Sequence, residues 1–212
     1  MNFDYKTYSM RAFLICSEKY KDRKESSLKV LENVGIKDVN LIDAVFVDKV
    51  PADYHQRFHA GKIKRFGLGM IGCYLAWENL LKTVVNTKGH IIAFEDDIYL
   101  TENFEKHFDE IHKVLCEESP VMIQLHNNNF LPGFSINRSP KRFVNTQALL
   151  INRNFKRQLS DWYSSYYGPS DQVFQCISEH YAFKKYHIDC DIARQCSSGS
   201  IIKVENKKPF TL

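Results

Sequence analysis

Residues 90–97 read His-Ile-Ile-Ala-Phe-Glu-Asp-Asp. A short apolar run followed at once by carboxylates is typical of a strand buried on both faces that ends at the edge of a parallel sheet. In an extended chain Glu95 and Asp97 point to one side and Asp96 to the other. Because two carboxylates on one side repel each other unless a cation lies between them, we predict that Glu95 and Asp97 bind Mn²⁺ or Mg²⁺ beside a phosphate-bearing ligand. The alternative is an acidic loop in which Asp96 or Asp97 caps the following segment.

Strands and helices alternate on both sides of this stretch. Apolar runs predict further strands over residues 11–16, 39–47, 121–125, 143–151 and 182–188. Apolar residues at steps of three and four predict five helices. Their apolar faces consist, in chain order, of Leu28, Leu31 and Val34; of Ile71, Tyr74, Trp77, Leu81 and Val84; of Phe104, Phe108, Ile111 and Leu115; of Phe155, Leu159 and Trp162; and of Val173, Phe174, Ile177 and Tyr181. Gly35 is the expected end of the first helix and Thr101 the expected N-cap of the third.

This order predicts an α/β fold with a Rossmann-type, mainly parallel central sheet flanked by helices. No repeat or linker interrupts the pattern, so we expect a single domain over residues 1–212. Ligands of such sheets bind beyond the carboxyl ends of the strands. Functional residues are therefore expected where the strands end.

Composition excludes several classes of protein. The 212 residues are 44% hydrophobic and 25% charged, which excludes a disordered chain, and a net charge of +4 is too small to indicate a nucleic-acid partner. No apolar run approaches the roughly 20 residues of a membrane span, and the first ten residues hold no run of signal-peptide length. The six cysteines form no Cys-x-x-Cys pair, so we expect free, buried thiols in a reducing, cytoplasmic compartment.

Basic residues follow the first strand. Ile15 and Ser17 stand at its end, before the basic residues Lys19, Lys21, Arg23 and Lys24. A strand, a basic turn and a helix start can bind a nucleotide, and a solvated basic helix start is the alternative. Neither Gly-x-Gly-x-x-Gly nor Gly-Lys-Ser/Thr occurs here, which excludes a dinucleotide fingerprint and a P-loop. Lys62, Lys64 and Arg65 either bind a diphosphate or face water.

Asp171 is the candidate general base. It follows Gly168 and Pro169 at the expected start of a helix, where it either accepts a proton or only complements the helix dipole. His126 and His187 end strands and are candidate ligand contacts, with His187 also a candidate metal ligand. No Ser-His-Asp or Cys-His order supports a covalent mechanism.

Six motifs, taken in chain order, resemble glycosyltransferase family 25, the group of lipopolysaccharide and collagen galactosyltransferases. Gly-Met-Ile-Gly-Cys-Tyr-Leu-Ala-Trp at residues 69–77 is similar to the family's Gly-Glu-Ile-Gly-Cys-x-Leu-Ser-His, and Phe-Glu-Asp-Asp at 94–97 to its Leu-Glu-Asp-Asp. The other four are the strand at 13–16 with Arg23, Ile-Asp-Ala-Val at 42–45, the late strand at 145–151 and Pro-Ser-Asp at 169–171.

The resemblance implies a GT-A type fold and inverting transfer of a hexose from a nucleotide sugar, usually UDP-galactose or UDP-glucose, to a glycan or glycolipid. It implies a nucleotide-sugar half at about residues 8–100 and an acceptor half at about 101–212. It makes Asp97, with Glu95, the Mn²⁺ ligand and Asp171 the base. Donor contacts are expected from Ile15, Ser17, Arg23, Ala44, Lys64, Glu95 and Asp96.

Three residues depart from the family pattern. Met70 stands where the family has glutamate, and Ala76 and Trp77 stand where it has Ser-His. These departures leave the donor sugar open. They also keep a rival function open, a non-catalytic module that binds nucleotide or glycan. A metal-dependent phosphohydrolase ranks last, because it needs further histidines or carboxylates around a second metal.

Overall fold

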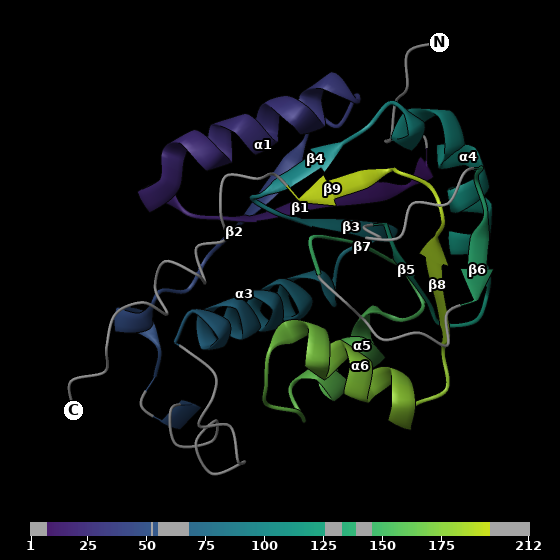
Figure 1. Ribbon diagram of the computed structural model, residues 1–212. Helices are drawn as coiled ribbons and strands as arrows, with labels where there is room; N and C mark the ends of the chain where they lie inside the picture. The colour runs from purple at the N-terminus through teal and green to yellow at the C-terminus, as the bar shows by residue number, and fades with distance from the viewer. Residues whose placement is uncertain (1–7, 52, 55–67, 126–132, 139–145, 196–212) are drawn as a thin grey trace.

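The computed structural model describes residues 8–51, 53–54, 68–125, 133–138 and 146–195 (Figure 1). Its main element is a seven-stranded sheet with the strand order β2-β1-β3-β7-β5-β8-β6. The strands are β1 (Met10–Cys16), β2 (Val39–Asp43), β3 (His90–Glu95), β5 (Val121–Gln124), β6 (Ile136–Arg138), β7 (Ala148–Ile151) and β8 (Lys184–Ile188).

Most strands of the sheet run in one direction. β1 pairs in parallel with β2 and β3, and β5 pairs in parallel with β8. β7 lies antiparallel between β3 and β5, and β6 is antiparallel to β8 at the edge. The register pairs Ile15 with Glu95 and Cys16 with Asp43, so β1, β2 and β3 end at the same edge.

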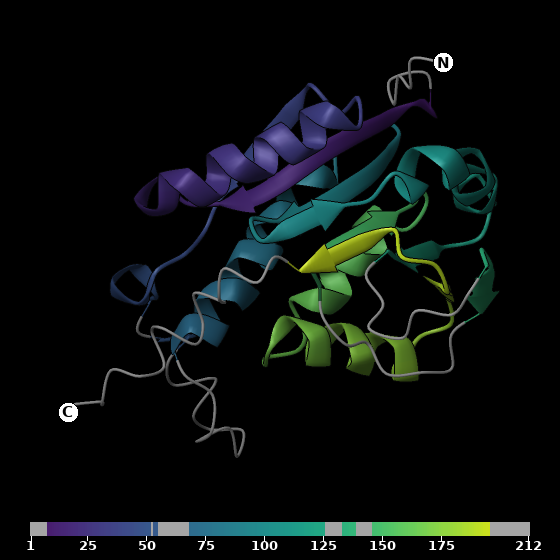
Figure 2. The ribbon, with the colours of Figure 1, turned by 45° about the horizontal axis from the view of Figure 1, so that its top comes forward.

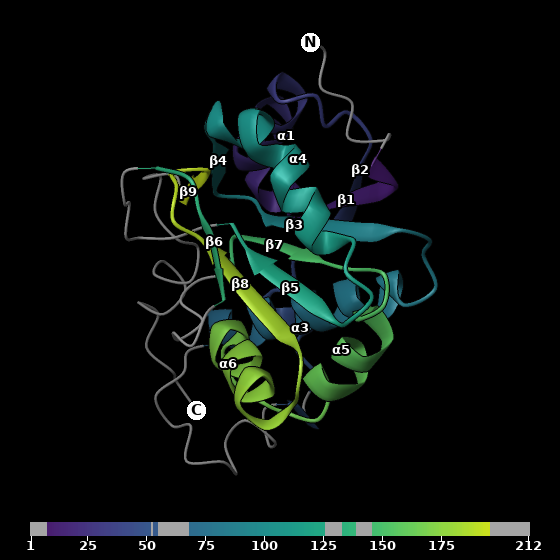
Figure 3. The ribbon, with the colours of Figure 1, turned by 90° about the vertical axis from the view of Figure 1, so that its right-hand side faces the viewer.

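Helices cover both faces of the sheet, as predicted. α1 and α4 lie on one face, and α3, α5 and α6 lie on the other (Figure 3). The helices are α1 (Lys21–Asn33), α3 (Leu68–Val84), α4 (Asn103–Leu115), α5 (Lys156–Tyr163) and α6 (Ser170–His180), with 3-10 turns η2 (Glu18–Tyr20) and η3 (Val47–Lys49).

The central strands β1, β3, β5 and β7 are buried on both faces because alternate residues enter two separate apolar clusters. Phe13 and Leu149 pack with Trp77 of α3 on one side, and Leu14 and Phe94 belong to the cluster on the α1 and α4 side. Large side chains with no exposed surface contribute about 1.5–3 kcal/mol each to stability. The two-sided burial explains why β1 and β3 read as continuous apolar runs.

A small second sheet approaches the end of β3. β4 (Ile98–Leu100) pairs antiparallel with β9 (Ala193–Gln195), and Ile98 lies opposite Gln195 (Figure 2). Because β4 begins directly after the acidic stretch, this pairing places the end of β9 beside Asp97. Neither short strand was predicted from the sequence.

The element boundaries agree with most predictions. Gly35 ends α1 with a φ of 81°, and its amide donates to the Glu32 carbonyl while the Ile36 amide donates to the Leu31 carbonyl. This is the left-handed helix end that glycine favours. The N-cap of α4 is Glu102 rather than the predicted Thr101, although the Thr101 hydroxyl accepts a hydrogen bond from the Asn103 amide at 3.3 Å.

Three predictions differ from the structure. β2 ends at Asp43 rather than at residue 47, and β7 begins at Ala148 and runs antiparallel to its neighbours. The thiols of the five described cysteines are free, but only Cys16 is buried; Cys73, Cys176 and Cys190 are partly buried and Cys116 is exposed. Cys196 lies outside the described residues. Within the described ranges, no helix combines the length and apolar character needed to cross a membrane.

Candidate functional site

The candidate site lies at the edge where β1, β2 and β3 end. β7 begins at this same edge, because it runs in the opposite direction, and the Glu95 amide donates to the Gln147 carbonyl at 2.9 Å. Residues before β7 therefore lie beside the last residue of β3. The structure brings the acidic stretch into contact with α1, α3, β9 and the start of β7.

Glu95 faces α3. Its Oε1 accepts hydrogen bonds from Trp77 Nε1 at 2.9 Å and Thr146 Oγ1 at 2.5 Å, and Cys73 Sγ lies 3.9 Å away. Burial, with the charge of Asp97, raises the pKa of Glu95 to about 7, although both hydrogen bonds lower it. Near neutral pH the Glu95 carboxyl is therefore poised to take up a proton or to be stabilised by a cation.

Asp96 and Asp97 lie around one guanidinium group. Arg23 Nη2 of α1 is 2.7 Å from Asp96 Oδ1 and 3.5 Å from Asp97 Oδ2. Gln195 Nε2 of β9 donates to Asp97 Oδ2 at 2.7 Å. Burial raises the pKa of Asp96 to about 6, against the opposing effect of Arg23.

These contacts correct the expected side-chain directions. Glu95 and Asp97 were expected on one side of an extended chain. The strand instead ends at Glu95, and the chain turns at Asp96 and Asp97. Asp97 therefore joins Asp96 at Arg23, while Glu95 contacts α3. A cation was expected between Glu95 and Asp97. In the structure, the Arg23 guanidinium lies instead between Asp96 and Asp97.

Asp96 and Asp97 each have one carboxylate oxygen that could bind a metal ion. Asp97 Oδ1 and Asp96 Oδ2 are buried and have no hydrogen-bond partner among the residues that the structure describes. Burying a carboxylate oxygen without a donor is costly. Carboxylate oxygens are also the ligands that Mn²⁺ and Mg²⁺ prefer. The donor set at Asp97 therefore fits a hard divalent cation.

Asp171 lies in the first turn of α6, and its neighbour Ser170 is close to Glu95. Ser170 Oγ is 3.3 Å from Cys73 Sγ, which in turn lies 3.9 Å from Glu95 Oε1. Asp171 is partly exposed, and its Oδ1 accepts a hydrogen bond from the Gln172 amide at 2.9 Å. Thus α6 begins near the edge of the sheet where β1, β2 and β3 end, which is where a general base would have to lie.

The end of β1 and the segment after β2 form the other side of the site. The Ala44 amide donates to the Cys16 carbonyl at 2.8 Å. Ser17 is buried, and its hydroxyl accepts from the Lys19 amide at 3.0 Å, so it caps η2. The side chain of Ile15 lies in the core cluster beneath α3.

Gly72 lets α3 pack against this segment. A Cβ at Gly72 would lie 2.1 Å from the carbonyl oxygen of Val45. Only a residue without a side chain allows this approach.

The structure separates His187 from the carboxylates. β8 is three strands from β3, a backbone separation of roughly 14 Å. His187 Nε2 lies 3.0 Å from Asp189 Oδ1, and within the described ranges its buried Nδ1 has no hydrogen-bond partner. The predicted contacts Lys62, Lys64, Arg65 and His126 lie outside the described residues.

Sequence reasoning missed the residues that hold the carboxylates. Trp77 was predicted on the apolar face of a helix and noted as a departure from the family pattern, and that departure was the available signal for its contact with Glu95. Thr146 is 51 residues from Glu95, and Gln195 is 98 residues from Asp97. No local pattern indicates contacts over such distances.

One comparison with known proteins identifies a family for this chain. Residues 10–197 match the model of a family described as "Glycosyltransferase family 25 (LPS biosynthesis protein)". The comparison with curated proteins found no match.

Solved structures similar to this chain include three proteins of low sequence identity. One is described as a "Putative Glucose-1-Phosphate Thymidylyltransferase from Bacillus anthracis" in complex with a sucrose, with 9% identity, a TM-score of 0.47, and coverage of 96% of this chain and 98% of that chain. The inositol-1-phosphate CTP transferase from T. maritima has 9% identity, a TM-score of 0.42 and coverage of 95% and 79%. The nucleoside-diphosphate-sugar pyrophosphorylase from Vibrio cholerae RC9 has 12% identity, a TM-score of 0.34 and coverage of 86% and 73%.

Proposed function

The chain belongs to glycosyltransferase family 25, and from this membership we propose that it is a metal-dependent, inverting hexosyltransferase. The donor is a nucleotide-diphosphate sugar, UDP-galactose or UDP-glucose, and the acceptor is a hydroxyl group of a glycan or glycolipid. The observation that carries the proposal is the family match over residues 10–197, which includes the acidic stretch and Asp171. The contacts around these residues support the individual roles.

Asp97 is the proposed metal ligand, with Glu95 as a second ligand: Glu95 Oε1 is held on the α3 side by Trp77 and Thr146, but the carboxyl group is close enough to Asp97 for the charge of Asp97 to raise its pKa. The buried Oδ1 of Asp97, which lacks a donor among the described residues, supports this role. A bound Mn²⁺ would offset the negative charge that develops on the departing diphosphate. Arg23 holds Asp96 and Asp97 in place, and its guanidinium adds positive charge on the same side as the end of β1.

Asp171 is the proposed general base. A carboxylate there would accept the proton of the acceptor hydroxyl as its oxygen attacks the anomeric carbon from the face opposite the diphosphate. A single displacement of this kind inverts the configuration at that carbon. The start of α6, where Ser170 contacts Cys73 and Cys73 lies beside Glu95, supports a base close to the donor.

The test is release of UDP from UDP-galactose and UDP-glucose over a panel of glycan acceptors, with Mn²⁺ and with EDTA. Transfer should require Mn²⁺, and Asp97→Asn should lower kcat by at least about 100-fold. Asp171→Asn should lower kcat by about 100- to 10,000-fold while UDP binding is unchanged. Asp161→Asn, an exposed change on α5, is the matched control and should keep full activity.

The outcomes separate the enzyme from its rivals. UDP-sugar binding without transfer or hydrolysis over the whole panel would identify a binding module. Trp77, which replaces the family's histidine and bonds to Glu95 Oε1, is the observation that favours that rival. Release of UMP and a hexose 1-phosphate in place of UDP would identify a phosphohydrolase, because such an enzyme cleaves the bond between the two phosphates of the donor.

A further inference from the structure

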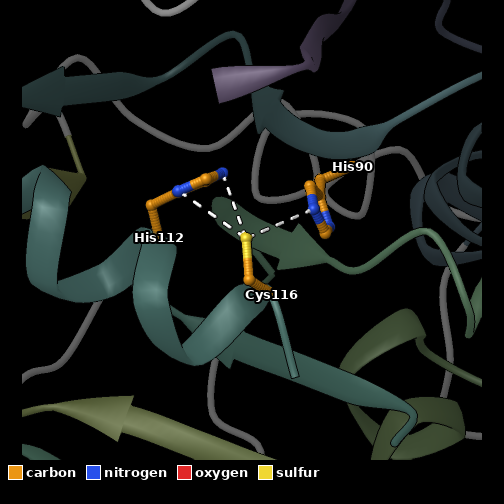
Figure 4. Close-up of side chains that lie close together, drawn as sticks. All are labelled: His90, His112 and Cys116. Carbon is orange, nitrogen blue, oxygen red and sulfur yellow. Dashed lines mark hydrogen bonds between the residues drawn. The ribbon is translucent and has the colours of Figure 1, made fainter. Parts of the chain in front are cut away.

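Two histidines and a cysteine meet far from the acidic stretch. His90 is the first residue of β3, His112 lies in the last turn of α4, and Cys116 directly follows that helix. Figure 4 shows the three side chains pointing toward one another from the strand and the helix. His90 and Glu95 are the first and last residues of β3, and five residues of extended chain span roughly 16 Å. The cluster therefore lies at the opposite edge of the sheet.

The distances within the cluster fit a tetrahedral metal site. Cys116 Sγ lies 3.9 Å from His90 Nε2 and 3.7 Å from His112 Nδ1. One ligand atom from each residue lies within 4.8 Å of the others, the single group of three such ligands found in the described part of the chain. Zinc–sulfur and zinc–nitrogen bonds of ordinary length place tetrahedral ligand atoms about 3.5 Å apart. The two nitrogen–sulfur distances exceed this value by only a few tenths of an ångström.

Neighbouring groups already orient His112. Its Nε2 lies 3.0 Å from the Tyr8 carbonyl oxygen, which can only accept a hydrogen bond, so Nε2 carries the proton. Nδ1 is then the nitrogen with a free lone pair, and the sulfur lies near both ring nitrogens, 3.7 Å from Nδ1 and 3.5 Å from Nε2. A backbone carbonyl on the second nitrogen is the usual partner of a metal-binding histidine. The spacing of four residues places His112 and Cys116 on one face of the helix end.

His90 is buried and held by the backbone. The Arg153 amide donates to His90 Nδ1 at 3.2 Å, so without metal the neutral ring carries its proton on Nε2, toward the sulfur. Burial lowers the pKa of His90 to about 4, which keeps the ring neutral. Metal binding at Nε2 moves that proton to Nδ1 and gives up the Arg153 hydrogen bond.

We propose that His90, His112 and Cys116 form a second metal site, selective for Zn²⁺. Two imidazoles and a thiolate suit zinc and disfavour Mn²⁺ and Mg²⁺. Cys116 is exposed, so water completes the fourth position. On binding, the Cys116 thiol releases its proton to solvent as the zinc–sulfur bond forms, with no change of oxidation state. The ion would tie the start of β3 to the end of α4.

The test uses the full, reduced chain, freed of metal, and titrates it with Co²⁺ as a spectroscopic substitute for Zn²⁺. We expect one equivalent to produce the near-ultraviolet absorption of a cobalt–thiolate bond, and Zn²⁺ to abolish it by displacement. Cys116→Ser should remove this absorption, and His112→Ala should weaken Co²⁺ binding tenfold or more. Cys176→Ser, at a free and partly buried thiol on α6, is the matched control and should leave the absorption unchanged.

Two results would overturn the proposal. One is no cobalt–thiolate absorption in the unmodified chain, and the other is the same absorption in Cys116→Ser. Because Cys116 is exposed, the serine variant should fold, and its unchanged metal-free Tm would verify this. Glycosyl transfer is not measured, so failure of this site and failure of the proposed enzymatic function are distinguishable.

Discussion

At the scale of single residues, Glu95 has the most consequential environment. Its carboxyl lies beneath α3, with hydrogen bonds from Trp77 and Thr146, and burial still raises its pKa to about 7. At pH values between 4.5, the ordinary pKa of a glutamate, and about 7, Glu95 carries a proton in the folded chain and has lost it in the unfolded chain. Stability from Glu95 is therefore present below pH 4.5 and lost as the pH rises to 7.

This environment predicts that Glu95→Gln stabilises the metal-free chain at pH 8. Glutamine resembles the protonated acid, and its carbonyl can accept both hydrogen bonds. A difference of one pKa unit between the folded and unfolded chain corresponds to about 1.4 kcal/mol of unfolding free energy. Because Glu95 is partly exposed, solvent reduces this contribution, and we expect Glu95→Gln to raise the free energy of unfolding by about 2 kcal/mol. Urea unfolding in EDTA measures it. At pH 4.5 the two proteins should be equally stable, and a gain of equal size at both pH values would contradict the assigned cause.

At the scale of elements, the contact of α3 with the segment after β2 depends on Gly72. Alanine inside a helix usually stabilises relative to glycine by up to about 1 kcal/mol. Here a Cβ would meet the Val45 carbonyl oxygen at 2.1 Å, so the helix or the segment must move. The same segment holds Ala44, a proposed donor contact.

We therefore predict that Gly72→Ala destabilises the chain by about 2 kcal/mol, the usual cost of overpacking. Thermal unfolding measures the effect. Gly168→Ala is the control, because its added Cβ would have only Val173 Cγ2 nearby, at 3.9 Å. Equal Tm values for Gly72→Ala and the unmodified chain would show that the contact is not tight.

At the scale of the whole molecule, the two proposed metal sites lie at opposite edges of the sheet. The acidic stretch follows the last residue of β3, and the His90 cluster begins at its first. Sites this far apart that share no residue act independently, so their effects on stability add. The sheet itself is the rigid spacer between them.

This arrangement predicts additive shifts in Tm. UDP with Mn²⁺ at 100 times its Kd contributes about 2.7 kcal/mol, which for a chain of this size raises Tm by roughly 5–10 °C. Differential scanning fluorimetry should show this shift undiminished in Cys116→Ser and absent in Asp97→Asn. The Zn²⁺ shift should follow the reverse pattern. A UDP and Mn²⁺ shift lost in Cys116→Ser would show that the sites are coupled.

The sequence determined the alternation of strands and helices, the acidic end of β3 and the family, because apolar periodicity and contiguous motifs are local properties. Only the tertiary structure decided that β7 runs antiparallel, that Arg23 and Gln195 bind Asp97, and that Trp77 bonds to Glu95. It also decided that His90 lies beside Cys116. These contacts depend on strand order and on the turn after Glu95, which bring together residues that are distant in sequence and that no local pattern relates.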